Sequence, residues 1–261
     1  MPLEIRPLQP ADALSWIRTR ALAYYGPTHD VLHNGLVSED SMRGVAEDRR
    51  REIGSPNVWH WKIVDTDLTP GKDEPADHQG RIIAVAVWKL MNAEDNACAR
   101  RKVKEELTTE HASIPVETEQ PATGHNPRYQ TFLPPELRLD ALQSLFVPLD
   151  TARDEIMGTE KPFFMLNSLA THPEHQGRGA ARLLLDWGIK KADDEGLVTF
   201  LDASQVARPI YEKRGFEVKR SIEWDRKVWG GEGVDVHYCM VRLPREVPQE
   251  KRRCLPVVSR T

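Results

Sequence analysis

Three observations in the sequence predict an α/β fold. Stretches with strand patterns alternate with stretches whose apolar residues recur at helical spacing. One predicted strand, Phe163–Thr171, runs through a glycine-containing turn directly into a helix. The 261 residues are 39% apolar and include seven Trp, which is enough to bury a core despite a mean hydropathy of −0.54. The length permits one large domain or two small ones.

Strand and helix patterns alternate through the first ninety residues. Residues 3–8 have the alternation of a short strand, and residues 10–22 have helical spacing. Residues 38–53 predict a second, largely solvated helix. Two strands follow at Val58–Val64 and Arg81–Leu90, and an exposed loop joins them.

Residues 92–160 differ from the rest because they lack strand patterns and are acidic. They carry a net charge of −6, whereas the remainder of the chain carries +2. Pro135 predicts the start of a helix whose apolar residues between Leu137 and Phe146 have helical spacing. A second short helix is predicted from about Thr151 to Met157. We therefore expect a helical and loop insertion here.

The alternation of strand and helix returns at residue 163. After the strand Phe163–Thr171, helical spacing extends from Leu183 to Ala192. A buried strand, Leu197–Leu201, and a helix near Val206–Arg214 follow. The last predicted strand is Val234–Leu243.

Charge, apolar runs and cysteines narrow the functional classes. A net charge of −4 argues against nucleic-acid binding through the overall field. The longest apolar run, residues 82–88, is far shorter than the roughly 18 residues of a membrane span, and the charged first twenty residues leave no core for a secretory signal. Cys98, Cys239 and Cys254 lack the paired spacing of a disulfide framework or a zinc site. We expect a cytoplasmic protein that binds neither nucleic acid nor a membrane.

The most informative stretch is the turn Gln176-Gly177-Arg178-Gly179-Ala180-Ala181, which follows the strand Phe163–Thr171. Glycines let a backbone approach an anion closely, and the N-terminus of the following helix adds N–H groups and partial positive charge. The turn therefore predicts a pyrophosphate site, to which Arg178 and Arg182 can add positive charge. The alternative is an ordinary helix-opening turn. The glycine spacing fits neither a dinucleotide fingerprint nor a Walker turn.

This turn resembles the signature of the GCN5-related N-acetyltransferase (GNAT) superfamily, which is Gln/Arg-x-x-Gly-x-Gly/Ala after a strand and commonly a Pro, here Pro173. About thirty residues on, Tyr211-Glu212-Lys213-Arg214-Gly215-Phe216 resembles a second signature of the same superfamily, a helix ending in Tyr-Glu-Lys-x-Gly-Phe. The resemblance is strongest over residues 163–218. The strand and helix order of residues 3–90 fits the first half of the family.

The resemblance implies the GNAT acyl-CoA N-acyltransferase fold, a mixed, mostly antiparallel twisted sheet with helices on both faces. Two adjacent parallel strands, here Phe163–Thr171 and Leu197–Leu201, would splay apart to admit acetyl-CoA. We expect a single domain over residues 1–243, with residues 92–160 inserted between the third and fourth strands. A basic C-terminal tail, residues 244–261, would follow it.

The resemblance also implies the residues of the site. Tyr211 matches the family tyrosine that protonates the departing CoA thiolate, the alternative being a tyrosine packed in the core. Asp202, at the predicted end of its strand, is the candidate general base, the alternatives being a cap or a solvent-facing residue. The family often has an Asn that contacts CoA near Ser204, and this sequence departs from that pattern. The residues expected to bind the cofactor are Leu169, Ala170, Thr171, Gln176, Gly177, Arg178, Gly179, Ala180, Ala181, Arg182 and Ser204.

Two further groups of residues have open roles. His172 and His175 lie beside the turn, but their spacing without a third ligand is weak for a metal, so we expect surface polar residues and no metal. Tyr24, Tyr25 and Asp30 follow the first predicted helix, where the family commonly shapes its acceptor site. A core or loop role suits them equally.

The implied function is that of an acetyl-CoA-dependent N-acetyltransferase, an enzyme that transfers an acetyl group directly to the amine of a small molecule. No covalent enzyme intermediate is needed. Two alternatives are a protein lysine or N-terminal acetyltransferase and a catalytically silent acyl-CoA-binding sensor. The acidic insertion would favour a cationic acceptor, or it would simply be a solvated face. We expect a monomer or a homodimer.

Overall fold

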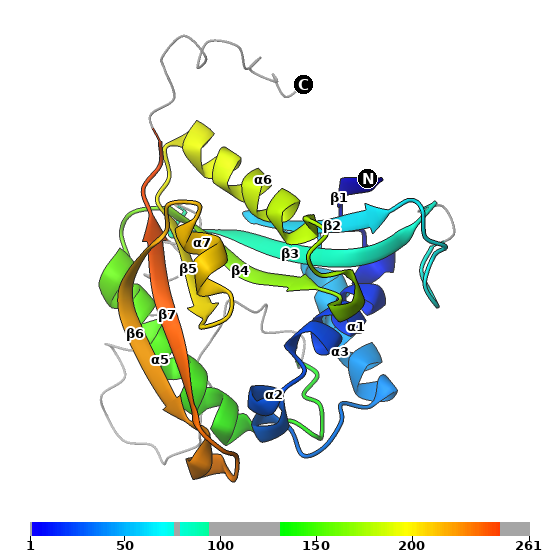
Figure 1. Cartoon of the computed structure of the whole chain (residues 1–261), viewed down its shortest axis with the longest axis horizontal. Helices are drawn as coiled ribbons and strands as arrows, with labels where there is room; N and C mark the ends of the chain where they lie inside the picture. The colour runs from blue at the N-terminus through cyan, green and yellow to red at the C-terminus, as the bar shows by residue number, and fades with distance from the viewer. Residues whose placement is uncertain (1, 76–78, 94–130, 246–261) are drawn as a thin grey trace, which may run out of the picture.

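The computed structural model describes residues 2–75, 79–93 and 131–245 (Figure 1). Its strands are β1 (Leu3–Pro7), β2 (Val58–Asp65), β3 (Arg81–Met91), β4 (Phe163–Thr171), β5 (Thr199–Ser204), β6 (Glu217–Asp225) and β7 (Val234–Arg242). Its α-helices are α1 (Ala13–Tyr24), α2 (Pro27–Leu32), α3 (Glu39–Glu52), α5 (Leu139–Met157), α6 (Ala180–Glu195) and α7 (Arg208–Glu212). Three short 3₁₀ helices are η1 (Pro10–Asp12), η3 (Pro173–His175) and η4 (Arg226–Trp229).

The seven strands form one sheet in the order β1-β2-β3-β4-β5-β7-β6. The pairing of β4 with β5 is parallel, and every other pairing in this sheet is antiparallel. The mixed, mostly antiparallel sheet predicted from the sequence is therefore confirmed. Because β4 and β5 run in the same direction, the chain must cross over between them, and α6 forms this crossover connection.

Local signals explain where the main helices begin and end. The Ser38 hydroxyl accepts a hydrogen bond from the Ser41 N–H at 3.2 Å, which caps the start of α3. Helix α6 ends at Gly196, whose φ of 69° is left-handed and suits glycine. These ends match the sequence-based expectations to within a few residues.

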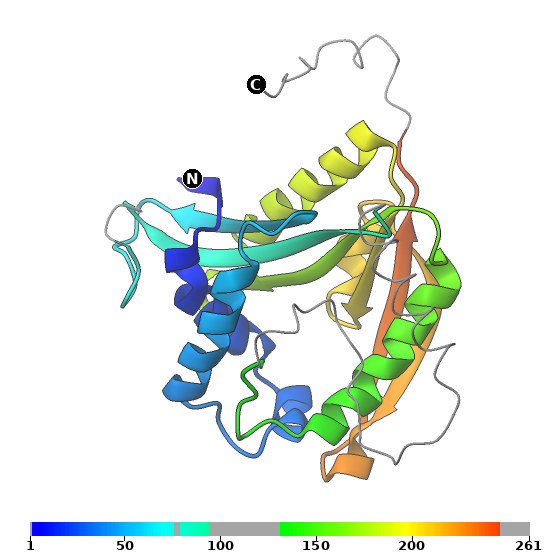
Figure 2. The ribbon, with the colours of Figure 1, turned by 180° about the vertical axis from the view of Figure 1, so that it is seen from behind.

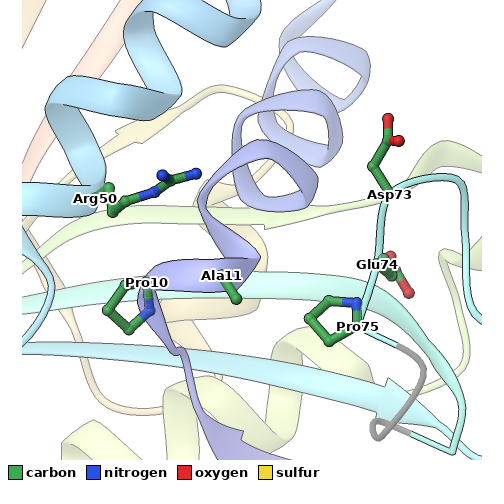
Figure 3. Close-up of a pocket in the computed structure, with 6 residues that line it drawn as sticks. All are labelled: Pro10, Ala11, Arg50, Asp73, Glu74 and Pro75. Carbon is green, nitrogen blue, oxygen red and sulfur yellow. The ribbon is translucent and has the colours of Figure 1, made fainter.

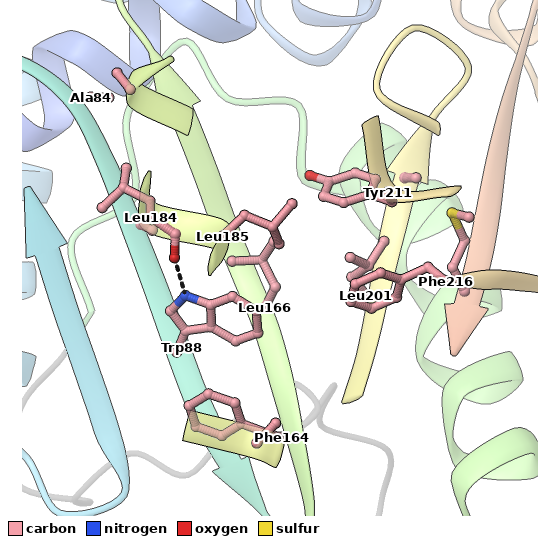
Figure 4. Packing of buried hydrophobic residues seen from close by; sticks show 14 of the residues in the cluster. Ala84, Trp88, Phe164, Leu166, Leu184, Leu185, Leu201, Tyr211 and Phe216 are labelled. Carbon is pink, nitrogen blue, oxygen red and sulfur yellow. Dashed lines mark hydrogen bonds between the residues drawn. The ribbon is translucent and has the colours of Figure 1, made fainter. Parts of the chain in front are cut away.

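Helices α6 and α7 lie on one face of the sheet (Figures 1 and 4). Trp88 of β3 is fully buried at the centre of this layer. Its ring stacks on Phe164 of β4 with centroids 5.0 Å apart, and its indole N–H donates to the Leu184 carbonyl of α6 at 3.4 Å. Leu166 of β4 and Leu201 of β5 belong to the same cluster. This core therefore holds the two parallel strands together beneath α6.

The opposite face carries α1 and α3 over one half of the sheet and α5 over the other (Figure 2). Trp16 and Ile17 of α1 pack with Val85 and Val87 of β3. Helix α5 packs with Phe200 and with residues of β6 and β7, and the Trp224 indole of β6 donates to the Ser144 hydroxyl at 2.9 Å. The buried residues of α5 are Ala141, Leu145, Leu149 and Ala152.

The insertion was wrongly predicted to hold two helices. The described part forms one helix of 19 residues, α5, which starts four residues after Pro135. Pro148 does not end it, because Pro148 lies on the exposed side and buried Leu145 and Leu149 flank it on the packed side. Packing against the sheet thus keeps α5 continuous through a proline, a residue that usually ends or kinks a helix. Most of the acidic stretch, residues 94–130, lies outside the described residues.

Two elements were not predicted, and two have bounds that differ from the predicted ones. Edge strand β6 carries several charged residues and has no strong apolar pattern of its own, because its pairing with β7 stabilises it. The six-residue helix α2 is too short for a periodic signal. Strand β5 ends at Ser204 rather than at Leu201, and α7 is only five residues long. Within the described residues, no helix is both long and apolar enough to cross a membrane.

The contact between α6 and Trp88 generates a stability prediction. A Cβ added at Gly188 of α6 would lie 2.1 Å from Cε2 of the buried Trp88 ring. We expect Gly188→Ala to lower the free energy of unfolding by about 2 kcal/mol, although alanine favours helices over glycine. Urea denaturation measures this. The same substitution in a Trp88→Phe background should cost clearly less, and a Gly188→Ala variant more stable than the wild type would contradict this packing.

Candidate active site

The parallel strands β4 and β5 pair over only three residues each. Phe164–Leu166 pairs with Thr199–Leu201, and beyond these residues the two strands diverge. From Ser168 to Thr171, β4 keeps its pairing with β3, so its other edge is free of β5. A bulge in the register at Asn167 coincides with the divergence. The splayed pair expected from the sequence is therefore present.

The glycine turn after β4 is open and supplies backbone donors. Gly177 and Gly179 have φ values of 73° and 89°, and no heavy atom lies within 4 Å of a Cβ built on either. Gly179 precedes the 16-residue helix α6, and no side chain caps its first turn. N–H groups at such a helix start bind anionic groups. The backbone from Gly177 to Arg182 therefore fits a phosphate group.

The two arginines of the turn differ in their partners. One guanidinium nitrogen of Arg178 lies 2.5 Å from a carboxylate oxygen of the fully buried Asp65, and another donates to Nδ1 of His175 at 3.3 Å. Arg178 thus ties the turn to the end of β2. Arg182 is mostly exposed, and its one ion-pair partner within residues 2–75, 79–93 and 131–245 is Asp186, one helical turn away, at 3.2 Å. Arg182 is the arginine of the turn whose charge remains accessible, because exposed pairs of this kind are weak.

Glu174 joins His172 and His175 in a cluster whose potential ligand atoms all lie within 4.8 Å of one another. The sequence did not suggest this third group. Nδ1 of His172 accepts a hydrogen bond from the Glu174 N–H, and Nδ1 of His175 accepts one from Arg178. In the neutral rings the proton then lies on Nε2, so neither nitrogen is ready to bind a metal. The nearby Arg178 guanidinium further disfavours a cation.

Tyr211 comes from α7 and is buried on the α6 side of the sheet. Its ring packs edge-on against Phe216, with centroids 5.9 Å apart. Figure 4 shows its hydroxyl pointing away from Phe216 toward the strand of Leu166. Burial, assisted by Tyr24, raises the pKa of the Tyr211 phenol above its ordinary value, although Arg214 lowers it. The phenol therefore keeps its proton at neutral pH.

Tyr24 reaches the divergence from the end of α1. Its hydroxyl lies 3.0 Å from the Ser168 hydroxyl of β4 and 3.4 Å from the Leu169 carbonyl oxygen. Its effect on the pKa of Tyr211 indicates that the two phenols lie near one another. Ser168 was not predicted as a site residue, because its burial in β4 and its contact with Tyr24 appear only in the structure. Tyr25 contacts His29 instead, and Asp30 lies beside His29 in α2.

Asp202 lies inside β5 rather than after its end, which corrects the sequence-based position. It shares a face with Phe200, which packs toward α5, because alternate strand residues point the same way. Tyr211 lies on the other face, with Leu201. Burial raises the pKa of the Asp202 carboxyl to about 6, although a hydrogen bond with the Cys239 thiol lowers it. One of its carboxylate oxygens is buried and has no hydrogen-bond partner in the described part of the chain.

Ser204 ends β5 and is exposed. Its hydroxyl accepts a hydrogen bond from the Ala207 N–H at 3.3 Å, within the turn that leads to α7. In the described structure this side chain therefore stabilises a turn. The other residues expected to bind the cofactor, from Leu169 to Arg182, form the free edge of β4 and the turn itself.

A separate surface hollow of about 550 Å³ lies beside η1 (Figure 3). Asp73 on its rim is already paired with Arg18 and Arg43. Edge strand β1 leads into this region, and β2 and β3 separate β1 from the diverging strands. The hollow is therefore distinct from the candidate active site. Its lining residues are Pro10, Ala11, Arg50, Asp73, Glu74 and Pro75.

A family model matches the part of the chain that forms this site. Residues 148–218 match the model described as an acetyltransferase (GNAT) domain. The match includes β4, the glycine turn, α6, β5 and Tyr211. It therefore contains both sequence motifs and both diverging strands.

Solved structures resemble the fold of nearly the whole chain. A structure described as histone acetyltransferase HPA2 and related acetyltransferase, from Corynebacterium glutamicum, is 16% identical with a TM-score of 0.53, and the match covers 95% of this chain and 99% of that chain. A polyamine N-acetyltransferase of Drosophila melanogaster is 12% identical with a TM-score of 0.55, and the match covers 92% of this chain and 99% of that chain. Arylalkylamine N-acetyltransferase 2 of Aedes aegypti is 13% identical with a TM-score of 0.54, and the match covers 94% of this chain and 100% of that chain. At these identities the likeness establishes the fold alone. Residues 148–218 therefore match a GNAT acetyltransferase domain, and GNAT acetyltransferases are acyltransferase enzymes.

Proposed function

We propose that this chain transfers the acetyl group of acetyl-CoA directly to the amine of a small molecule. The observation that carries the proposal is the divergence of β4 and β5 beside an open glycine turn. A buried phenol, Tyr211, lies on one face of the sheet there, and a buried carboxyl, Asp202, lies on the other. One face thus provides a proton donor and the other a proton acceptor.

Acetyl-CoA, when bound, supplies an activated acyl thioester. The free edge of β4 at Leu169–Thr171 offers backbone groups that would pair with the amides of the pantetheine arm, as an added strand would. The N–H groups between Gly177 and Arg182 would hold the pyrophosphate. Arg182 would add an accessible positive charge.

The two titratable groups suit the two proton transfers of a direct acetyl transfer. Asp202, with a pKa of about 6, is ionised at neutral pH and would accept the proton that an ammonium group must lose before it attacks the thioester carbonyl. Tyr211 keeps its proton and would donate it to the thiolate that leaves. The acceptor gains an acetyl group, and CoA leaves as the thiol.

A small acceptor fits the arrangement better than a polypeptide. Helix α5 packs against β5, β6 and β7 on the Asp202 face, where Asp202 is half-buried, so we expect little room there for a polypeptide. Two of the similar folds carry names with small amines, polyamine and arylalkylamine N-acetyltransferases, while a third is described as histone acetyltransferase HPA2 and related acetyltransferase. A cytoplasmic location and a monomeric or homodimeric state stay predictions.

The function is tested by thiol release from acetyl-CoA with a panel of small amines and lysine or N-terminal peptides. We expect release with small amines that exceeds the rate of acetyl-CoA hydrolysis. Release with peptides alone would support a protein acetyltransferase. Binding of CoA without release for any acceptor would support the sensor alternative, and an absence of CoA binding would contradict the proposal at its basis.

Tyr211→Phe tests the proton donor. We expect kcat to fall by about 100-fold, because general acid catalysis typically contributes that much or more, while the affinity for CoA changes little. Stopped-flow thiol detection and equilibrium CoA binding measure the two effects. Tyr238→Phe on neighbouring β7 is the matched control, because Tyr238 packs against Arg208 rather than at the divergence. Equal kcat values for Tyr211→Phe and the wild type would contradict the role of Tyr211.

Asp202→Asn tests the proton acceptor through stability as well as activity. The folded-state pKa of about 6 lies above the ordinary value of 3.8, so the fold favours the protonated carboxyl, and stability is lost as pH rises through this window. Above pH 6 the ionised carboxylate therefore costs up to about 3 kcal/mol. We expect Asp202→Asn to raise the free energy of unfolding at pH 7.5 and to leave it unchanged near pH 3.5, as measured by urea denaturation.

The same variant should lose activity while it gains stability. Wild-type kcat/KM should rise with pH through about 6, as the Asp202 carboxyl ionises, and Asp202→Asn should lack this rise. A variant that is destabilised at pH 7.5, or that keeps the wild-type pH profile, would show that Asp202 is a structural residue.

A further inference from the structure

Two half-buried cations near the candidate active site have no carboxylate partner among the described residues. Lys89 of β3 forms no ion pair there, whereas the other lysines of the described chain are either exposed or paired, as Lys62 is with Asp12. Arg20 of α1 contacts only the ring of Tyr24, with its guanidinium carbon 5.5 Å from the ring centroid. A sequestered cation without a counterion is costly, which suggests that an anion is missing.

The fold places Arg20 over β3. Trp16, Arg20 and Tyr24 are spaced four residues apart and therefore share one face of α1. The Trp16 ring packs against His60 of β2, and the Tyr24 hydroxyl contacts Ser168 of β4. Arg20 lies between these two contacts, and the strand between β2 and β4 is β3.

Lys89 lies on the same face of β3. Val85 and Val87 pack against α1, and Lys89 continues their alternation. Burial is the main cause that lowers the pKa of Lys89. The charges of Arg49, Arg153 and Arg20 lower it further, whereas the charge of Glu52 raises it. The two cations therefore face a common region.

The neighbouring charges do not supply the missing anion. Glu52 is already paired with Arg49 of the same helix. Arg153 of α5 is paired with Asp150 and with Asp154, which leaves those carboxylates engaged as well. Among the described residues, Lys89 and Arg20 are thus the cations of this region that have no directly paired carboxylate.

This region borders the diverging strands. Lys89 pairs with Met165, and Leu166, the next residue, is the last residue of β4 that pairs with β5. Two strand spacings, roughly 10 Å, separate the backbones of β3 and β5. Tyr24, which Arg20 contacts, reaches Ser168 at the divergence itself. An acceptor that reaches both the Asp202 side and the two cations would have to span about this distance.

We propose that Lys89 and Arg20 form an anion subsite of the acceptor site, and that the acceptor carries a carboxylate in addition to its amine. The proposal rests on the proposed acetyltransferase function and narrows its substrate class to amino acids and related amino carboxylates. Lys89 supplies a compact ammonium charge, and Arg20 supplies a planar guanidinium that can bind a carboxylate through two hydrogen bonds.

The test uses acceptors that differ only by a carboxylate, namely arginine and agmatine, ornithine and putrescine, and tyrosine and tyramine. Thiol release is measured for the wild type, Lys89→Met, Lys89→Arg and the control Lys161→Met, an exposed lysine before β4. We expect the wild type and Lys161→Met to favour the carboxylate member of at least one pair by ten-fold or more in kcat/KM. Lys89→Met should lose that preference, and Lys89→Arg should keep most of it.

Thermal shift with the same compounds, in the presence of CoA, separates this proposal from the proposed function. The carboxylate members should raise the Tm of the wild type more than their partners do, and Lys89→Met should abolish the difference, even if no thiol is released. An absence of thiol release would count against the acetyltransferase function alone. Equal rates and equal Tm shifts within every pair, or a preference that survives in Lys89→Met, would overturn the anion subsite.

Discussion

The parallel pairing of β4 with β5 stops after three residues, and the rest of the candidate active site depends on this constraint. The buried cluster of Trp88, Phe164 and Leu201 holds the paired part together beneath α6. Beyond it, β4 keeps its hydrogen bonds to β3, and β5 keeps its hydrogen bonds to β7, so neither strand loses its order when the two separate. At the opening, each strand therefore keeps one hydrogen-bonded neighbour and exposes its other edge. An opening of this kind, framed by ordered strands, can hold an extended ligand with little reorganisation.

The two faces of the opened sheet carry different chemistry. Helices α6 and α7 bring the glycine turn and Tyr211 to one face. The other face carries Asp202 of β5, Lys89 of β3 and Arg20 of α1. The first face has backbone donors and a phenol that keeps its proton, which suit a phosphate-bearing thioester. The second has a carboxyl whose pKa is raised by burial and two cations that have no carboxylate partner among the described residues, which suit an acceptor of mixed charge. Donor and acceptor would thus meet at the divergence from opposite sides.

The sequence predicted the features that depend on contiguous residues. The turn from Gln176 to Arg182 and the helix with Tyr211 follow from local glycine, proline and aromatic spacing, and they lie in the structure where the sequence indicated. The position of Asp202 within β5, the contact of Tyr24 with Ser168 and the charged edge strand β6 depend on pairing between distant segments, so no local pattern contains them. The continuity of α5 through Pro148 also depends on packing against the sheet. Lys89 interrupts an apolar run, which is visible in the sequence, but that no described carboxylate pairs with it appears only once α1 and α5 are in place.

The most direct test of the central claim is amide hydrogen exchange with and without acetyl-CoA. If the divergence and the glycine turn form the acetyl-CoA site, acetyl-CoA should slow exchange in residues 167–171 and 177–182 and leave β1 and β2 unchanged, because bound backbone N–H groups exchange more slowly. Slowed exchange centred on another region, such as the hollow beside Pro10 and Glu74, or no change in these two segments under conditions where acetyl-CoA binds, would contradict the account.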